Sequence, residues 1–167
     1  MTLIALVETV VIAAALLCSL VAGLLFAFAV VVMPGISRLD DASFIRAFAA
    51  IDRVIQNNQP LFMLVWVGSV LAVIAAAALG WWTAAGVDRL LLVFAAVVYL
   101  LGVQMPTGMI NIPLNNRLQR LDLATMTDAA RRHARQSFER RWNRWNVIRT
   151  IAAIAVVVLL LVVLLGL

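Results

Sequence analysis

Four long apolar runs constrain the fold of this 167-residue chain more than any other feature. The hydrocarbon core of a bilayer is about 30 Å thick, and about 20 apolar residues in a helix cross it. The runs extend from Leu3 to Met33, from Leu61 to Leu79, from Leu90 to Ile110 and from Val147 to Leu167. Residues 1–167 are therefore predicted to form one all-α membrane domain, a four-transmembrane-helix bundle.

The composition agrees with this fold class and excludes others. Apolar residues make up 65% of the chain and charged residues 13%, whereas a soluble domain has roughly 45–50% and about 25%. The single cysteine, Cys18, excludes an intrachain disulfide. The first run has no basic segment before it and carries Glu8, so we expect it to stay in the mature protein rather than to be removed as a signal peptide.

The arginines indicate how the helices are oriented. Four crossings place both termini and the turn from Trp81 to Arg89 on one side, and the loops at 33–60 and 111–146 on the other. Every basic residue is an arginine, and all except Arg89 lie in or beside those two loops. The positive-inside rule predicts a multi-pass protein of the cell membrane with cytoplasmic loops and both termini outside. The arginines are expected to contact anionic lipid headgroups, and no nucleic acid, because no soluble aromatic-interleaved module accompanies them.

Two segments outside the apolar runs have helical patterns. Asp40 or Asp41 can cap an amphipathic helix in the membrane interface, which stops at the Asn-Asn-Gln-Pro sequence of 57–60. Its apolar positions are Phe44, Ile45, Phe48, Ile51, Val54 and Ile55, with Arg46, Asp52 and Arg53 elsewhere around the helix. Thr127 can cap another helix, and neither Gly nor Pro occurs from Asp128 until Gly166. The fourth membrane helix is thus predicted to be a rod of about 40 residues, roughly 60 Å long, with a long cytoplasmic extension.

Polar side chains concentrate where the third and fourth runs reach the loops. Gln104 and Pro106 predict a kink in the third run, which is followed by Asn-Ile-Pro-Leu-Asn-Asn at 111–116. On the fourth helix, one stripe with the spacing i, i+3, i+4, i+7 holds Trp142, Trp145, Asn146 and Arg149. One interpretation is structural: interfacial Trp, a snorkelling Arg and capping Asn side chains. The other is a ligand pocket with donors for an anionic or phenolic group and indoles for a planar ring.

Three segments carry a distinctive pattern in a fixed order. They are Ala22–Phe28 followed by Val32–Gly35, then Asn111–Asn116, then Trp142–Asn146 ahead of Arg149–Thr150. In order and spacing, over nearly the whole chain, they resemble the anthrone oxygenase-like (DUF1772) membrane family. The resemblance implies a small four-span membrane protein. For some members it also implies oxidation of an anthrone to an anthraquinone by O₂ without metal or flavin.

The resemblance thus suggests a cofactor-free oxygenase for a lipophilic aromatic, anthrone-like substrate, a reaction that needs a base and fixed donors for an oxyanion. The predicted catalytic residues are Asn111, Asn115, Asn146 and Arg149. The predicted substrate-binding residues are Asn116, Trp142, Trp145, Gln104 and Met33. No base is evident, since Asp52 would have to reach in from the interfacial helix. No cofactor and no metal are predicted, because one His and one Cys far apart supply no ligand set for haem, copper or non-haem iron.

Two other functions fit the sequence. One is a non-enzymatic accessory subunit that binds a membrane protein partner or a second copy of itself through small-residue helix faces and the Arg-rich rod. The other is a small carrier for a hydrophobic molecule. Catalysis requires the catalytic residues to converge on one cavity, whereas docking predicts an exposed arginine ridge and no cavity. A carrier predicts a polar path from Gln104 to the opposite side near Glu8.

Overall fold

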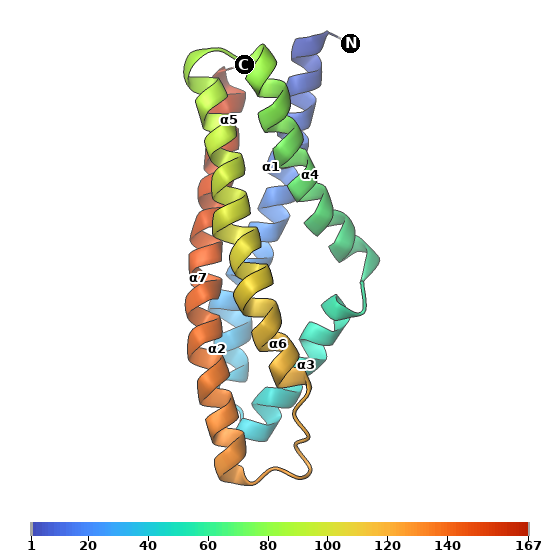
Figure 1. Ribbon diagram of the computed structural model, residues 1–167, viewed down its shortest axis with the longest axis vertical. Coiled ribbons are helices and arrows are strands. Elements are labelled where there is room, and N and C mark those ends of the chain that lie inside the picture. Colours follow the sequence, from blue (N-terminus) through green and yellow to red (C-terminus); the bar gives the residue numbers. More distant parts are fainter. Residues whose placement is uncertain (1, 167) are drawn as a thin grey trace.

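The computed structural model describes residues 2–166 and consists of helices joined by short turns and loops (Figure 1). Within these residues there is no strand, so the predicted all-α bundle is confirmed. With η denoting a π-helix, the elements in chain order are α1 (Leu3–Ala27), η1 (Phe28–Val32), α2 (Met33–Ile36), α3 (Asp41–Gln56), α4 (Pro60–Thr83), α5 (Gly86–Tyr99), η2 (Leu100–Gln104), η3 (Thr107–Asn111), α6 (Ile112–Gln119) and α7 (Asp128–Gly166).

These elements form four rods. The first is α1 with η1 and α2, the second is α4, the third runs from α5 through η2 and η3 to α6, and the fourth is α7. Each rod is long and apolar enough to cross a membrane, which makes the chain a multi-pass membrane protein. Both chain ends and the α4–α5 turn lie at one end of the bundle, and the other loops at the opposite end (Figure 1). We call these the terminal end and the arginine-rich end.

The rods extend past the predicted ends of the apolar runs. The third rod was expected to end near Ile110, but it remains helical to Gln119, so the amides of 111–116 lie on successive helical turns. The fourth rod has 39 residues, which confirms the predicted long helix. Thr127 caps it as predicted, because its hydroxyl accepts a hydrogen bond from the Ala130 N–H at 3.3 Å.

Three prolines inside the first and third rods each follow a π-helical segment by two residues. Pro34 follows η1, Pro106 follows η2 and Pro113 follows η3. Proline has no N–H, and its ring clashes with the carbonyl four residues earlier, so a regular α-helix cannot pass through it undisturbed. A wider π turn makes room for the ring while the rod continues. The disturbance predicted around Pro106 therefore takes the form of two π segments.

The core at the terminal end is apolar and closely packed, and we call this region the packed half. Its fully buried residues include Val11, Ala14, Val73, Ala76, Leu92, Ala95, Val156 and Leu160. Small residues let helix backbones approach one another closely. A Cβ atom on Gly102, for example, would lie 2.8 Å from the Cβ of Ala152 on α7. This mainly apolar core occupies the bundle toward the terminal end.

The amphipathic helix α3 closes the arginine-rich end by packing on α6 and α7. Asp40 caps it, as predicted, with a carboxylate oxygen that accepts a hydrogen bond from the Ser43 N–H at 3.0 Å. Interactions with the Ser43 side chain, and then with its N–H, lower the pKa of the exposed Asp40 carboxyl. The charged form of the cap is therefore favoured at the start of the helix.

The apolar positions of α3 do not all face the protein. Phe44 and Phe48 are buried, and Asp52 is buried beside them, at 3% exposure. Ile51 and Val54, apolar positions of the same helix, are 36% and 57% exposed. The apolar surface of an interfacial helix can contact lipid as well as protein, so apolar positions alone do not define the side that meets the protein.

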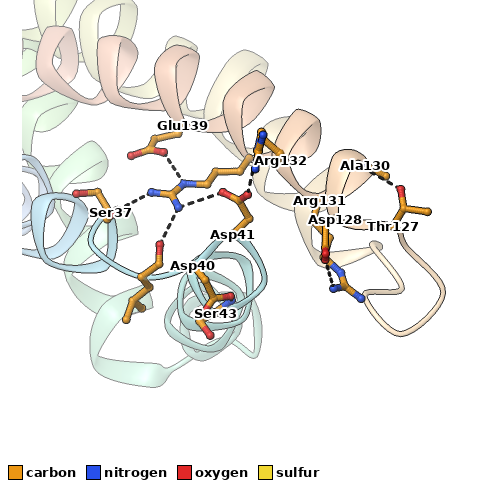
Figure 2. Close-up of polar contacts among 12 residues, drawn as sticks. Ser37, Asp40, Asp41, Ser43, Thr127, Asp128, Ala130, Arg131, Arg132 and Glu139 are labelled. Carbon is orange, nitrogen blue, oxygen red and sulfur yellow. Dashed lines mark hydrogen bonds and ion pairs between the residues drawn. The ribbon is translucent and has the colours of Figure 1, made fainter.

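One arginine of α7 holds the loop that leads into α3. Arg135 donates hydrogen bonds to the carbonyl oxygens of Ser37, at 2.6 Å, and Leu39, at 2.8 Å. It also pairs with Asp41 at 3.2 Å and with Glu139 at 2.9 Å. Figure 2 shows Ser37, Asp41 and Glu139 gathered around this guanidinium. Arg135 thus fixes α3 against α7, a role that the distribution of arginines in the sequence did not reveal.

Candidate functional site

A cavity of about 370 Å³ lies between the end of α1 with η1, α3, the beginning of α4, the η3–α6 segment and α7. Small-molecule sites are commonly clefts of about 300–1,000 Å³ with apolar walls and a few convergent polar groups. The polar residues lining this one are Asp52, Gln56, Thr107, Asn111, Asn115, Asn116, Asn146 and Arg149. We call it the polar cavity, and the surrounding part of the bundle the cavity half.

The Asp52 carboxylate is surrounded by amide donors. Its oxygens accept hydrogen bonds from Nε2 of Gln56 at 2.6 Å, Nδ2 of Asn115 at 2.7 Å and Nε2 of Gln119 at 2.7 Å. The indole N–H of Trp142 donates to Oδ1 of Asn115 at 2.8 Å. An indole can only donate, so this contact fixes the Asn115 amide with its Nδ2 toward Asp52. Residues from α3, α6 and α7 therefore hold the carboxylate in one position.

The Arg149 guanidinium is held by neutral acceptors. Arg149 is 4% exposed, and its two terminal nitrogens donate to Oγ1 of Thr107 at 2.9 Å and to Oδ1 of Asn146 at 3.0 Å. Thr107 donates its own hydroxyl proton to the Val103 carbonyl, which leaves its oxygen free to accept. Asn146 donates Nδ2 to the Leu25 carbonyl at 3.0 Å, and this bond sets its Oδ1 toward Arg149.

Several groups at the cavity have hydrogen-bonding capacity to spare. Asn111 is 2% exposed, and neither its amide nitrogen nor its amide oxygen has a partner; Nε of Arg149 also lacks one. Within residues 2–166, neither Asp52 nor Arg149 takes part in an ion pair. Buried polar groups in folded proteins are nearly always paired, and buried unpaired charges are costly. The cavity therefore has donors and acceptors that are available to a bound molecule.

Aromatic side chains form one wall of the cavity. The ring centroid of Trp142 lies 5.6 Å from that of Phe28 and 5.3 Å from that of Phe48. The guanidinium carbon of Arg149 lies 5.8 Å from the Trp142 ring centroid. These distances are in the range of favourable aromatic and cation–π contacts. The wall offers a planar ligand both ring faces and ring edges next to a cation.

The structure brings most of the predicted site residues together. All four predicted catalytic residues line the polar cavity, and so do two of the predicted substrate-binding residues. The catalytic set is Asn111, Asn115, Asn146 and Arg149, and the two substrate-binding residues are Asn116 and Trp142. The convergence that catalysis requires is thus present, together with a cavity that simple docking did not predict.

The other three predicted substrate-binding residues lie elsewhere. Met33 is buried and lines a separate cavity beside Ser37. Trp145 and Gln104 are half-buried and do not line the polar cavity. The buried positions of α7 follow 142, 146, 149, 150 and 153, so Trp145 falls at the edge of that face. A spacing of three residues from Trp142 did not suffice to place it inside.

Sequence reasoning underestimated two members of the site. Asp52 was placed away from the apolar positions of its helix, and Thr107 was not among the predicted site residues. Asp52 comes four residues after the buried Phe48, and Thr107 four residues after the buried Val103. That spacing puts each polar side chain on the same helical face as a core residue, which is the signal that could have found both.

Groups of three or more His, Cys, Asp or Glu side chains that could hold a metal ion do not occur in the described part of the chain. The polar atoms of the cavity are mainly amides, one hydroxyl, one carboxylate and one guanidinium.

The fold and the cavity define a four-span membrane protein with a buried polar site in one half of its helical bundle. The family model of anthrone oxygenase matches residues 52–159, a range that begins at Asp52 and includes every polar residue of the cavity. The chain therefore belongs to the anthrone oxygenase family, which confirms the predicted resemblance. No curated protein and no solved structure matches it.

Proposed function

We propose that this chain is an oxygenase that oxidises a lipophilic, anthrone-like aromatic compound with O₂. The observation that carries the proposal is the burial of two unpaired charges, Asp52 and Arg149, at one cavity with aromatic walls. A base and a donor for a developing oxyanion are the two groups that such a reaction needs. Membership of the anthrone oxygenase family supports the same chemistry.

The first step is the removal of a proton from the CH₂ group of the central ring. The Asp52 carboxylate accepts this proton, and the C–H electron pair enters the ring system as an enolate with negative charge on the former carbonyl oxygen. Nε of Arg149 and the Asn111 amide are the free donors that stabilise this oxygen. Trp142 and Phe48 contact the flat rings.

The remaining steps consume O₂ as the only oxidant. The enolate carbon gives an electron to O₂, and the two radicals combine to form the C–O bond of a peroxide anion. This anion takes back the proton held by Asp52. The hydroperoxide then loses its remaining C–H proton and its outer oxygen as water, which leaves a second carbonyl. One anthrone and one O₂ yield one anthraquinone and one water, and Asp52 ends as a carboxylate.

Oxygen uptake by purified protein in lipid nanodiscs, with a simple anthrone as substrate, tests the proposal. Asp52→Asn and Arg149→Leu should each lower protein-dependent uptake by about 10²-fold or more, as expected for loss of a general base or an oxyanion donor. Arg144→Leu, at an exposed position of the same helix, is the matched control and should keep the wild-type rate.

Thermal unfolding of each variant separates loss of chemistry from loss of the fold, and a metal determination on the same samples accompanies the assay. Wild-type uptake no faster than spontaneous oxidation of the anthrone would contradict the proposal, as would full activity of Arg149→Leu. Binding of the anthrone without turnover would favour a carrier instead.

We infer from the arginine distribution that the arginine-rich end faces the cytoplasm in the cell membrane, with anionic headgroups beside it. The polar cavity then lies at the inner leaflet. With Cys18 replaced by Ala, a charged thiol reagent should label the exposed position of Gln136→Cys in inverted membrane vesicles but not in intact cells. The opposite pattern would reverse the orientation.

A further inference from the structure

The rim of the polar cavity differs between its two sides. On the side of the loops, α3 packs on both α6 and α7. There Nε2 of Gln56, at the end of α3, donates a hydrogen bond to Oδ1 of Asn116 on α6 at 3.1 Å. The same nitrogen also donates to Asp52. This polar contact joins the two helices on the side of the rim that faces away from the apolar part of the rods.

On the other side, the rim is apolar and has no such contact. The second rod, α4, packs along α1 and α5 but makes no extensive contact with α6. In Figure 1 the beginning of α4 diverges from α6 as it approaches α3. The apolar side chains with which these two helices line the cavity include Phe62 and Trp66 of α4, whose ring centroids lie 5.4 Å apart, and Ile112 of α6, which is 47% exposed.

We propose that the opening between α4 and α6 is a lateral portal through which the ligand reaches the polar cavity directly from the bilayer. The ligand class is an uncharged, planar aromatic molecule dissolved in lipid. Such a molecule meets only apolar side chains on this route, whereas a charged one would have to leave water to pass them. The inference rests on the proposed function in that this ligand is the oxygenase substrate.

A substrate that enters through the portal contacts the side chains of the cavity in a definite order. The flat rings pass between Ile112 and the stacked pair of Phe62 and Trp66, and they then meet the aromatic wall that includes Trp142. The polar edge of the molecule meets Asn111 and Arg149 last. Asp52, which is 3% exposed and accepts three amide hydrogen bonds, stays out of bulk water while the ligand arrives from the lipid.

Thiol accessibility tests the portal without any need for turnover. The sole native cysteine is first removed by Cys18→Ala. Leu25→Cys then places a thiol on the α1 wall of the cavity, at a position that is 4% exposed; Leu24→Cys, half-buried on the same wall, is the alternative position should the first variant fold poorly. The protein in nanodiscs is treated with N-(1-naphthyl)maleimide, which partitions into lipid, or with the charged 2-(trimethylammonium)ethyl methanethiosulfonate.

The exposed Gln136→Cys serves as the reference thiol for both reagents. Relative to that reference, the naphthyl reagent should label the cavity thiol at least tenfold faster than the charged one does. A plug, Ile112→Trp, should slow naphthyl labelling at least tenfold. The matched control Met109→Trp, on a 70% exposed position of the same rod that does not line the cavity, should not change it.

The portal is overturned if the charged reagent labels the cavity thiol as fast as the naphthyl reagent, if the plug has no effect, or if neither reagent reaches the thiol. Oxygen uptake is measured on Ile112→Trp without the cysteine changes. Wild-type protein without uptake but with plug-sensitive labelling would refute the oxygenase and keep the portal. Uptake that persists unchanged in Ile112→Trp, with unchanged labelling, would refute the portal alone.

Discussion

The packed half and the cavity half are built from the same four rods, yet they bury different chemistry. In the packed half, the core is mainly Ala, Val and Leu, and its polar pair is satisfied: Ser69 donates to the Trp66 carbonyl, so Tyr99 donates to Ser69 at 2.6 Å. In the cavity half, Asn111 and Arg149 are almost as deeply buried but keep unused hydrogen-bonding atoms. The buried polar pair of the first region is hydrogen-bonded within the protein, whereas the second region keeps donors and acceptors that the proposed ligand would use.

The difference shows how a small membrane protein can stay folded although part of its bundle buries polar groups that lack hydrogen-bond partners. Helices in lipid associate through close packing, because lipid tails are as apolar as the helices themselves. Small residues in the packed half supply that packing. Incompletely bonded polar groups lower stability, and here they lie beside a region that holds the rods together. The packed half gives way to the cavity half at η2 and η3, the two π segments around Pro106.

The largest loss of stability is expected from adding a side chain where two helices of the packed half lie closest, at Gly102. Gly102→Val should lower the free energy of unfolding by about 3 kcal/mol, the upper range for overpacking, because even a Cβ there would lie 2.8 Å from the Cβ of Ala152. Gly108→Val, six residues later in the same rod, is the matched control, since nothing lies within 4 Å of its added Cβ. Thermal unfolding in detergent measures both variants.

Equal melting temperatures for the two glycine variants would show that the rods are not held by close packing at Gly102, and the distinction between the halves would then lose its energetic basis. Arg149→Leu should lose oxygen uptake while remaining folded, so the glycine pair and this variant together test whether stability and turnover depend on different halves. One half should control stability and the other turnover.

A smaller loss of stability is expected for a change at Arg135, a residue that contributes both to stability and to the position of Asp52. Arg135→Gln removes the ion pairs with Asp41 and Glu139 and should lower the free energy of unfolding by about 1.5 kcal/mol, the lower range for hydrogen bonds to charged groups. Oxygen uptake should fall as well, because α3 carries Asp52. Arg140→Gln, exposed on α7, should change neither quantity. If Arg135→Gln behaves like this control, the apolar contacts of α3 and its hydrogen bonds with α6 hold it without Arg135.

Much of the fold could be predicted because local rules decide it. The length of the apolar runs sets the four rods, Asp40 and Thr127 start the helices they were expected to start, and Pro106 disturbs its helix. The site was partly predictable for the same reason. Asn146 and Arg149 share a face of one helix through their spacing alone.

The remaining members of the site required knowledge of which helices are neighbours. Asp52 lies inside because α6 and α7 pack over that face of α3 and supply Asn115 and Gln119 as donors. Trp145 misses the cavity by its position around α7, although the sequence places it on nearly the same stripe as Trp142. In the sequence, nothing distinguishes Arg135 from the other arginines of its run. Only in the structure does the loop at 37–41 lie against it and accept its hydrogen bonds.

The sequence by itself determined that this chain is a four-span all-α membrane protein of the anthrone oxygenase family, with its polar residues gathered at one end. Hydropathy and helical spacing act along the chain, so they can be read without a structure. Tertiary structure alone decided that Asp52 joins Arg149 at one cavity and that α4 makes no extensive contact with α6 beside it. Both outcomes depend on the packing of residues far apart in sequence, and no local pattern encodes which buried polar groups lack partners.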